Sequence, residues 1–135
     1  MKLFAFIIAI CVIMVPAIQS CNNYSDVPVG VSDSRGELLV NTWKIEQYKI
    51  NGEDFTSLIP KYTESFTKNG NYNYAWSVSN GSGTWKFIHA DSEVKLSGTD
   101  KQASRTLHIL KLEEKSLWYY YIDGNDKHEF HLIEQ

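Results

Sequence analysis

Four histidines are the residues of this chain whose chemistry first suggests a metal site. His128 and His131 stand three residues apart in a segment that predicts a strand, where residues at this spacing point to opposite faces. They cannot hold one ion together, and the order His-Glu-Phe-His differs from the helical His-Glu-x-x-His motif of zinc enzymes. His89 and His108 can meet only through the fold. We therefore expect no metal site and no cofactor.

The other candidates for chemistry predict turns rather than catalytic groups. The segment 123–126, Asp-Gly-Asn-Asp, is too short for a twelve-residue calcium loop and predicts a hairpin turn. The segment 81–83, Gly-Ser-Gly, is not the Gly-x-Ser-x-Gly elbow that carries a nucleophilic serine. Glu113 and Glu114 predict a solvated turn, and nothing selects two carboxylates on facing strands for glycoside hydrolysis. We expect a protein that is not an enzyme.

Aromatic side chains offer the most to a ligand, since aromatic walls with a few polar tips are typical of small-molecule sites. Strand alternation assigns eight of them to one interior face: Trp43, Tyr74, Trp76, Trp85, Phe87, Tyr119, Tyr121 and Phe130. These rings either line a ligand cavity or fill the interior, and the second alternative is the simpler. Trp118 and Tyr120 fall on the opposite face, where exposed aromatic rings suit contact with a sugar or a protein.

Short strands joined by turns must position these rings. From residue 38 onward the chain repeats a strand of about seven residues followed by Asn, Asp or Gly, which favours an all-β fold. Eight such strands predict a small antiparallel up-and-down barrel, because closing the sheet removes its exposed edges. An eight-stranded barrel has an interior that side chains just fill, or that holds one small ligand.

Local signals add detail to this barrel. Asn51-Gly52, Asn69-Gly70 and the segment 80–83 predict turns, and Tyr72, Tyr74, Trp76 and Val78 are expected to share one face of a strand. The apolar positions of the first strand change parity near Glu46, which predicts a β-bulge, and a second slip falls within 107–112. Residues 53–59 place apolar side chains at helical spacing and predict one short helix.

The N-terminus predicts export. Lys2 precedes an unbroken apolar run of thirteen residues, 3–15, which suits a signal peptide and is short for a membrane span. The segment 17–21, Ala-Ile-Gln-Ser-Cys, then resembles the lipobox of bacterial lipoproteins. This resemblance implies a signal peptide over 1–20, cleavage before Cys21, and lipid on that cysteine, with fatty acids such as palmitate. Ordinary secretion with cleavage near Ser20, or an uncleaved anchor, are the alternatives.

The residues after Cys21 predict a tether. Residues 21–37 mix Pro, Gly, Ser, Asn and Asp without a sustained period, which is typical of a flexible linker. The alternation of Val27, Val29 and Val31 leaves open an extra edge strand instead. Asn22 gives no strong signal for retention at the inner membrane, so we expect the outer membrane or the cell surface.

Charge limits the choice of partner. The formal net charge is −3, and the 13 Lys and Arg residues are scattered along the chain. A nucleic-acid partner needs a clustered basic surface, so we expect none.

The segment 38–135 resembles the lipocalin-like domain of small bacterial lipoproteins. The resemblance is carried by strand and turn patterns at 39–43 (LVNTW), 51–52 (NG), 65–72 (SFTKNGNY), 83–85 (GTW) and 109–112 (ILKL). It implies a barrel and a small hydrophobic ligand, and the aromatic side chains add a glycan-like molecule as the other candidate. We therefore expect a membrane-anchored, non-catalytic binding module. The alternative is a protein-interaction module with a filled barrel, either an accessory of an envelope complex or a barrel-type protease inhibitor.

Overall fold

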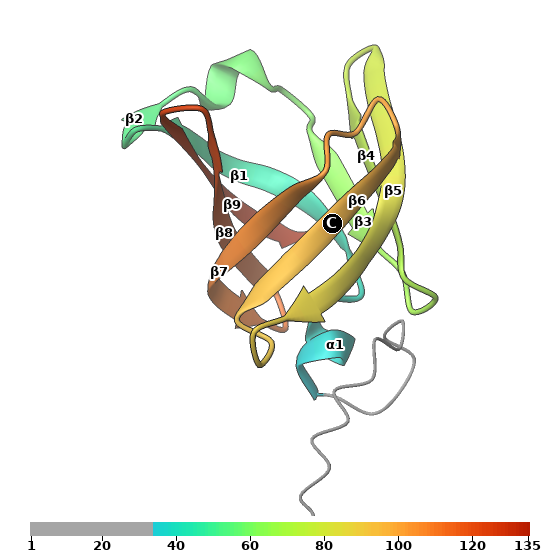
Figure 1. Cartoon of the computed structure of the whole chain (residues 1–135). Helices are drawn as coiled ribbons and strands as arrows, with labels where there is room; N and C mark the ends of the chain where they lie inside the picture. The colour runs from blue at the N-terminus through green and yellow to red at the C-terminus, as the bar shows by residue number, and fades with distance from the viewer. Residues whose placement is uncertain (1–33) are drawn as a thin grey trace, which may run out of the picture.

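The computed structural model describes residues 34–135, which form one short α-helix, one 3-10 helix and nine strands (Figure 1). The elements are α1 Ser34–Leu39, β1 Thr42–Ile50, β2 Glu53–Asp54, η1 Thr56–Leu58, β3 Thr63–Phe66, β4 Asn71–Trp76, β5 Ser79–Ile88, β6 Glu93–Asp100, β7 Arg105–Glu113, β8 Ser116–Asp123 and β9 Asp126–Glu134. No helix within these residues is long and apolar enough to cross a membrane.

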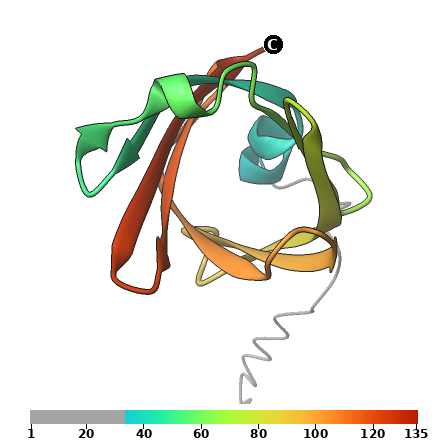
Figure 2. The same ribbon diagram turned by 90° about the horizontal axis from the view of Figure 1, so that it is seen from above.

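The strands form a closed antiparallel barrel, as the sequence predicts. Each of the strands β3 to β8 pairs with the next along the chain, β1 pairs with β3, and β9 returns to pair with β1. The two-residue strand β2 lies outside this ring and extends β1 at the Asn51-Gly52 turn. Figure 2 looks along the barrel and shows the closed ring, with α1 behind it. Eight strands therefore make the wall and the ninth is an appendage.

Both expected irregularities of the strands are present. The register of β1 against β9 shifts between Ile45 and Gln47, so Glu46 is a β-bulge. A second shift, between Ile109 and Lys111, puts a bulge at Leu110. A bulge changes which residues of a strand face inward. In a regular strand, Trp43 and Tyr48 would point to opposite faces, because their numbers differ in parity. The first bulge places both of them on the inner face, where both are buried.

One predicted turn is wrong. Residues 80–83 lie inside β5, and the chain instead turns at Ser77 and Val78, where Trp76 pairs with Ser79. Val78 is 95% exposed at this turn and does not share the inner face of Tyr72 and Tyr74. The glycines of this segment serve close packing: a side chain at Gly81 would collide with the Tyr74 ring, and one at Gly83 with the Ser97 carbonyl.

The predicted helix and linker need adjustment. Within residues 53–59 the helical part is the single 3-10 turn η1, preceded by β2. The last residues of the predicted linker, 34–37, are helical and belong to α1. The predicted signal peptide, the lipidated Cys21, and the alternative edge strand around Val29 lie outside the described residues.

Side chains fill the end of the barrel next to α1. Leu39, the last residue of α1, and Trp43 are both fully buried. The Trp43 indole donates a hydrogen bond of 3.1 Å to the Leu39 carbonyl, which ties the helix to the first strand. Phe66 and Trp85 meet edge to face nearby, with ring centroids 5.8 Å apart. This end of the barrel therefore holds an apolar core.

Candidate functional site

A cavity of about 210 Å³ occupies the barrel interior toward the end opposite α1. Inward-facing side chains from β4, β6, β7, β8 and β9 surround it, and the exposed β6–β7 loop forms part of its rim. Its lining residues are Tyr62, Tyr72, Tyr74, Leu96, Lys101, Gln102, Ala103, Arg105, Leu107, Tyr119, Tyr121 and Phe130. Five of these are tyrosines, and we call this cavity the tyrosine pocket.

Half of the eight aromatic residues expected in the interior line this pocket: Tyr74, Tyr119, Tyr121 and Phe130. Trp43 and Trp85 are buried in the core, whereas Trp76 and Phe87 are partly buried and pack against it. Both alternatives for the interior therefore hold, each in one part of the barrel: side chains fill the core, and a cavity lies at the tyrosine pocket.

A buried carboxyl group, Glu64, lies behind the tyrosines. Its side chain is 1% exposed, and three hydroxyls donate hydrogen bonds to its Oε2 atom. The donors are Tyr62 at 2.9 Å, Tyr72 at 2.8 Å and Tyr119 at 3.0 Å. The other oxygen, Oε1, is buried and has no hydrogen-bond partner among the described residues. Glu64 thus connects β3, β4 and β8 through the interior of the barrel.

Burial dominates the electrostatics of this cluster. It raises the pKa of Glu64 to about 7, although the hydrogen bonds from Tyr72, Tyr62 and Tyr119 and the charge of Arg105 all act to lower it. Burial, and then the charge of Glu64, raise the pKa of each of the three tyrosines well above its ordinary value. The hydroxyls therefore stay protonated as donors, while Glu64 changes charge near neutral pH.

Arg105 supplies a cation to the wall of the pocket. It is the first residue of β7 and is half-buried. Its guanidinium carbon lies 4.1 Å from the centroid of the Tyr121 ring, which is a cation–π contact. Burial raises the pKa of Tyr121, and the positive charge of Arg105 opposes that rise. The pocket thus combines aromatic faces, hydroxyls and a guanidinium.

Sequence reasoning did not select several residues of this site. Glu64 alternates with Tyr62 and Phe66 in the sequence, and this period of two places it on the inner face of β3. A charged residue at an inward position is the signal that marks such a cluster. The sequence carries no comparable signal for Arg105. The alternation of residues along its strand does not show which positions lie beside a cavity.

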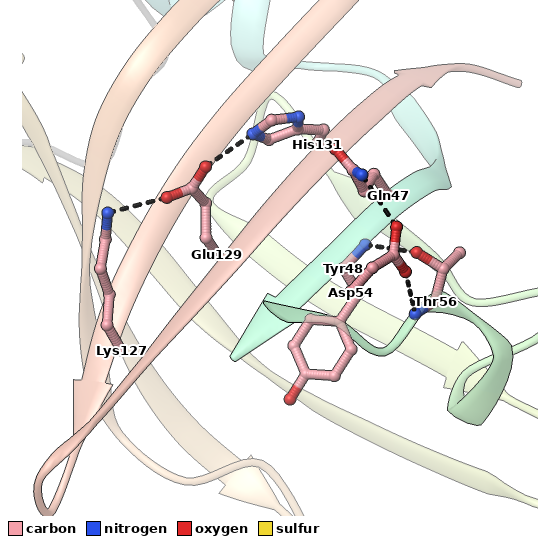
Figure 3. A network of polar contacts seen from close by, with 7 residues as sticks. All are labelled: Gln47, Tyr48, Asp54, Thr56, Lys127, Glu129 and His131. Carbon is pink, nitrogen blue, oxygen red and sulfur yellow. Dashed lines mark hydrogen bonds and ion pairs between the residues drawn. The ribbon is translucent and has the colours of Figure 1, made fainter. Parts of the chain in front are cut away.

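A short polar network holds the rim of the barrel near β2 (Figure 3). Gln47 donates to one oxygen of Asp54 at 2.8 Å, and the Thr56 backbone N–H donates to the other at 2.8 Å. The Thr56 hydroxyl accepts a hydrogen bond from the Tyr48 backbone N–H at 2.9 Å. The hydrogen bonds from Gln47 and Thr56 to Asp54 lower the pKa of Asp54 to about 2. They attach η1 to β1 and so position the segment that leads to Tyr62.

Trp118 and Tyr120 lie on the outer face of the barrel and are half-buried. His131 stacks on Trp118 with 4.0 Å between ring centroids, and His108 stacks on Tyr120 at 4.7 Å. On β9, Glu129 accepts a 2.7 Å contact from Lys127 and a 2.8 Å contact from His131 (Figure 3). Neighbouring side chains of the barrel thus already contact both rings.

The four histidines fall into three separate clusters. His131 faces outward, whereas the Nδ1 atom of His128 lies 2.7 Å from the Tyr48 hydroxyl. His89 and His108 do meet through the fold, because each contacts one oxygen of Glu93. No group of three His, Cys, Asp or Glu side chains within residues 34–135 is arranged to hold a metal ion.

Comparison with known proteins adds no family to this picture. No protein-family model matches the chain, and a sequence search of the curated proteins found no match. The barrel and the pocket are therefore the basis for any statement about function.

Proposed function

We propose that this protein is a membrane-anchored, non-catalytic binding module that holds one small ligand in the tyrosine pocket. The observation that carries the proposal is the cavity of about 210 Å³ inside the barrel. Small-molecule sites are typically concave, with aromatic walls and a few converging polar groups, and the tyrosine pocket has this composition.

The size and lining of the pocket limit the ligand. The cavity holds the volume of roughly seven liquid waters, at about 30 Å³ each, and is smaller than most drug-sized sites. Its lining includes hydroxyls, an amide and a guanidinium as well as ring faces. A compact ligand with one ring and several polar groups fits this description better than a long apolar chain does.

Anchoring through Cys21 is part of the same proposal. Its support is the lipobox-like segment that ends an apolar N-terminal run. The described chain enters the barrel at α1, and the β6–β7 loop lies at the other end (Figure 1). Residues of this loop line the tyrosine pocket. A lipid anchor ahead of residue 34 would join the barrel at the end away from the mouth of the pocket. An envelope protein as a further partner stays a prediction of the sequence.

Native mass spectrometry of the full chain, purified in mild detergent from its own envelope, tests the binding function. We expect an additional mass that is lost on denaturation. Ala103→Trp, which places a large ring among the lining residues, should remove that mass. Ala75→Trp, at an exposed position of β4, is the matched control and should retain it. A bare mass for the wild-type protein would count against the proposal.

Cell fractionation tests the anchor. Cys21→Ala should move the protein out of the membrane fraction, because no acceptor for the lipid remains. Cys11→Ala is the control: it changes the other cysteine of the chain, within the predicted signal peptide, and should leave the protein with the membranes. Equal membrane association of Cys21→Ala and wild type would show that the lipobox hypothesis is wrong.

A further inference from the structure

We infer that the tyrosine pocket selects a small organic anion, namely a compact ring that carries one carboxylate group, and that Arg105 is the residue that recognises this group. The inference rests on the proposed function and names the class of its ligand. It does not follow from the barrel alone, because a barrel of this form accommodates apolar and neutral ligands equally well.

The charged side chains that line the pocket have one sign. Its lining contains two cations, Lys101 on the exposed loop and Arg105 in the wall, and contains no carboxylate. The nearest interior acid, Glu64, is not a lining residue, and three tyrosine hydroxyls are bonded to it. A ligand in the pocket therefore meets positive charge directly and meets the negative charge only behind the tyrosines.

Arg105 has unused capacity to bind an anion. It forms no ion pair with a carboxylate of the described residues. Its guanidinium carbon lies over the Tyr121 ring, and the Tyr121 side chain also takes part in a hydrogen bond with Arg105. A guanidinium has five N–H donors along its edges, which suit the two oxygens of a carboxylate. A ligand carboxylate would give Arg105 a direct ion pair in addition to its electrostatic interaction with the buried Glu64. The stacking on Tyr121 orders the group before the ligand arrives.

The rest of the pocket suits a ring. The Tyr62 and Tyr74 rings stack with centroids 6.2 Å apart, and Phe130 packs against Tyr62 at 5.5 Å. These faces, together with hydroxyl groups, offer stacking and hydrogen bonds to a flat aromatic ring or to a sugar ring. The carboxylate is the chemistry that an aromatic acid and a sugar acid share, so the test must distinguish these two sources.

Titration of the ¹⁵N-labelled full chain in detergent micelles, followed by NMR, provides this test. The probes are two matched pairs that differ in charge: benzoate with benzamide, and glucuronate with glucose. We expect the anion of at least one pair to shift the backbone signals of Arg105 and Tyr121 and to bind about tenfold or more tightly than its neutral partner, since a hydrogen bond to a charged group contributes that much. The pair that responds identifies an aromatic acid or a sugar acid.

Substitutions assign the effect to Arg105. Arg105→Gln should abolish the preference for the anion and leave binding of the neutral partner unchanged, whereas Arg105→Lys should retain part of the preference. Lys111→Gln removes the same charge from the same strand, on a side chain that contacts the exposed Glu113 and the outer ring of Trp118. It should behave as the wild type. If Arg105→Gln does not fold, the comparison of Arg105→Lys with the wild type decides the matter.

The outcomes separate this inference from the proposed function. Equal binding of charged and neutral probes at the pocket would overturn the anion selectivity and leave the binding function standing. Shifts that spare Arg105 and Tyr121, or no shift with any of the four probes at millimolar concentration, would also overturn the inference. The inference and the proposed function would both be overturned only if native mass spectrometry finds the protein without a bound ligand and none of the four probes shifts the NMR signals.

Discussion

Glu64 makes the stability of the barrel depend on pH in an unusual direction. Burial raises its pKa from the ordinary 4.5 to about 7 in the folded protein. Below pH 4.5 the group is protonated in both the folded and the unfolded chain, and its full stabilising contribution is present. As the pH rises from 4.5 to 7, the unfolded chain releases this proton before the folded chain does. The free energy of unfolding must therefore fall across this window.

The size of the effect follows from the shift. One pKa unit corresponds to 1.36 kcal/mol, so the difference between 4.5 and about 7 amounts to about 3 kcal/mol. Glu64→Gln keeps the shape of the side chain and removes the titrating proton. We expect the free energy of unfolding of the wild type, minus that of Glu64→Gln, to decrease by about 3 kcal/mol between pH 4.5 and 8.

Urea denaturation followed by tryptophan fluorescence, repeated at several pH values for both proteins, measures this difference. The other shifted carboxyls, Glu93, Glu129 and Asp54, have lowered pKa values, so their contributions are lost as the pH falls through those values. They are present in both proteins and cancel in the subtraction. Parallel pH profiles for the two proteins would refute the reasoning. If Glu64→Gln fails to fold, the pH dependence of the Glu64 carboxyl carbon signal in the wild type gives the pKa directly, and an ordinary value would be equally decisive.

Two further substitutions test the packing of the barrel. Trp85→Ala should lower the free energy of unfolding, measured in a urea melt, by about 3–5 kcal/mol, because the ring is 2% exposed, packs edge to face on Phe66, and donates a hydrogen bond of 3.1 Å to the Thr67 carbonyl. An unchanged midpoint would mean that the ring is not in the core. Gly81→Ala should destabilise the protein by about 1–3 kcal/mol through overpacking against the Tyr74 ring, whereas Ser82→Ala, a change at the next residue of the same strand, should keep a stability near that of the wild type. Equal stability of the two variants would show that Gly81 does not serve close packing.

The sequence predicts the barrel well because its period-two patterns and turns are local signals. The Asn51-Gly52 turn is a clear example: both residues have positive φ angles, 51° and 88°, as the two-residue hairpin turns with this sequence require. The change of parity at Glu46 is equally local, since the inward positions on either side of a bulge appear directly in the sequence.

The failure at residues 80–83 has a different cause. Asn-Gly-Ser-Gly is typical of a turn, and the local sequence does not show that the Tyr74 ring and the Ser97 carbonyl lie against Gly81 and Gly83. Those contacts come from strands that the fold brings alongside β5. A glycine that permits close approach and a glycine that permits a turn look the same in a single sequence.

The pocket is beyond local reasoning for a similar reason. Alternation identifies inward residues but not the depth at which each lies along the barrel, and that depth separates Trp43 and Trp85 in the core from Tyr74 and Tyr121 at the cavity. Depth depends on the stagger of all the strands around the closed sheet. The same stagger places Tyr119 of β8 beside Glu64 of β3, at a separation of 55 positions in the chain.

The polar cluster also argues that the pocket is more than a packing defect. If stability alone shaped the interior, apolar side chains in place of Glu64 and its three tyrosine partners would be at least as favourable, since burying a carboxyl is costly even with good hydrogen bonds. The hydroxyls of Tyr62, Tyr72 and Tyr119 instead converge on one carboxylate oxygen at distances of 2.8 to 3.0 Å. These bonds hold three lining residues from separate parts of the chain in defined positions around the cavity. Departures from an apolar core of this kind are expected where the interior serves a ligand.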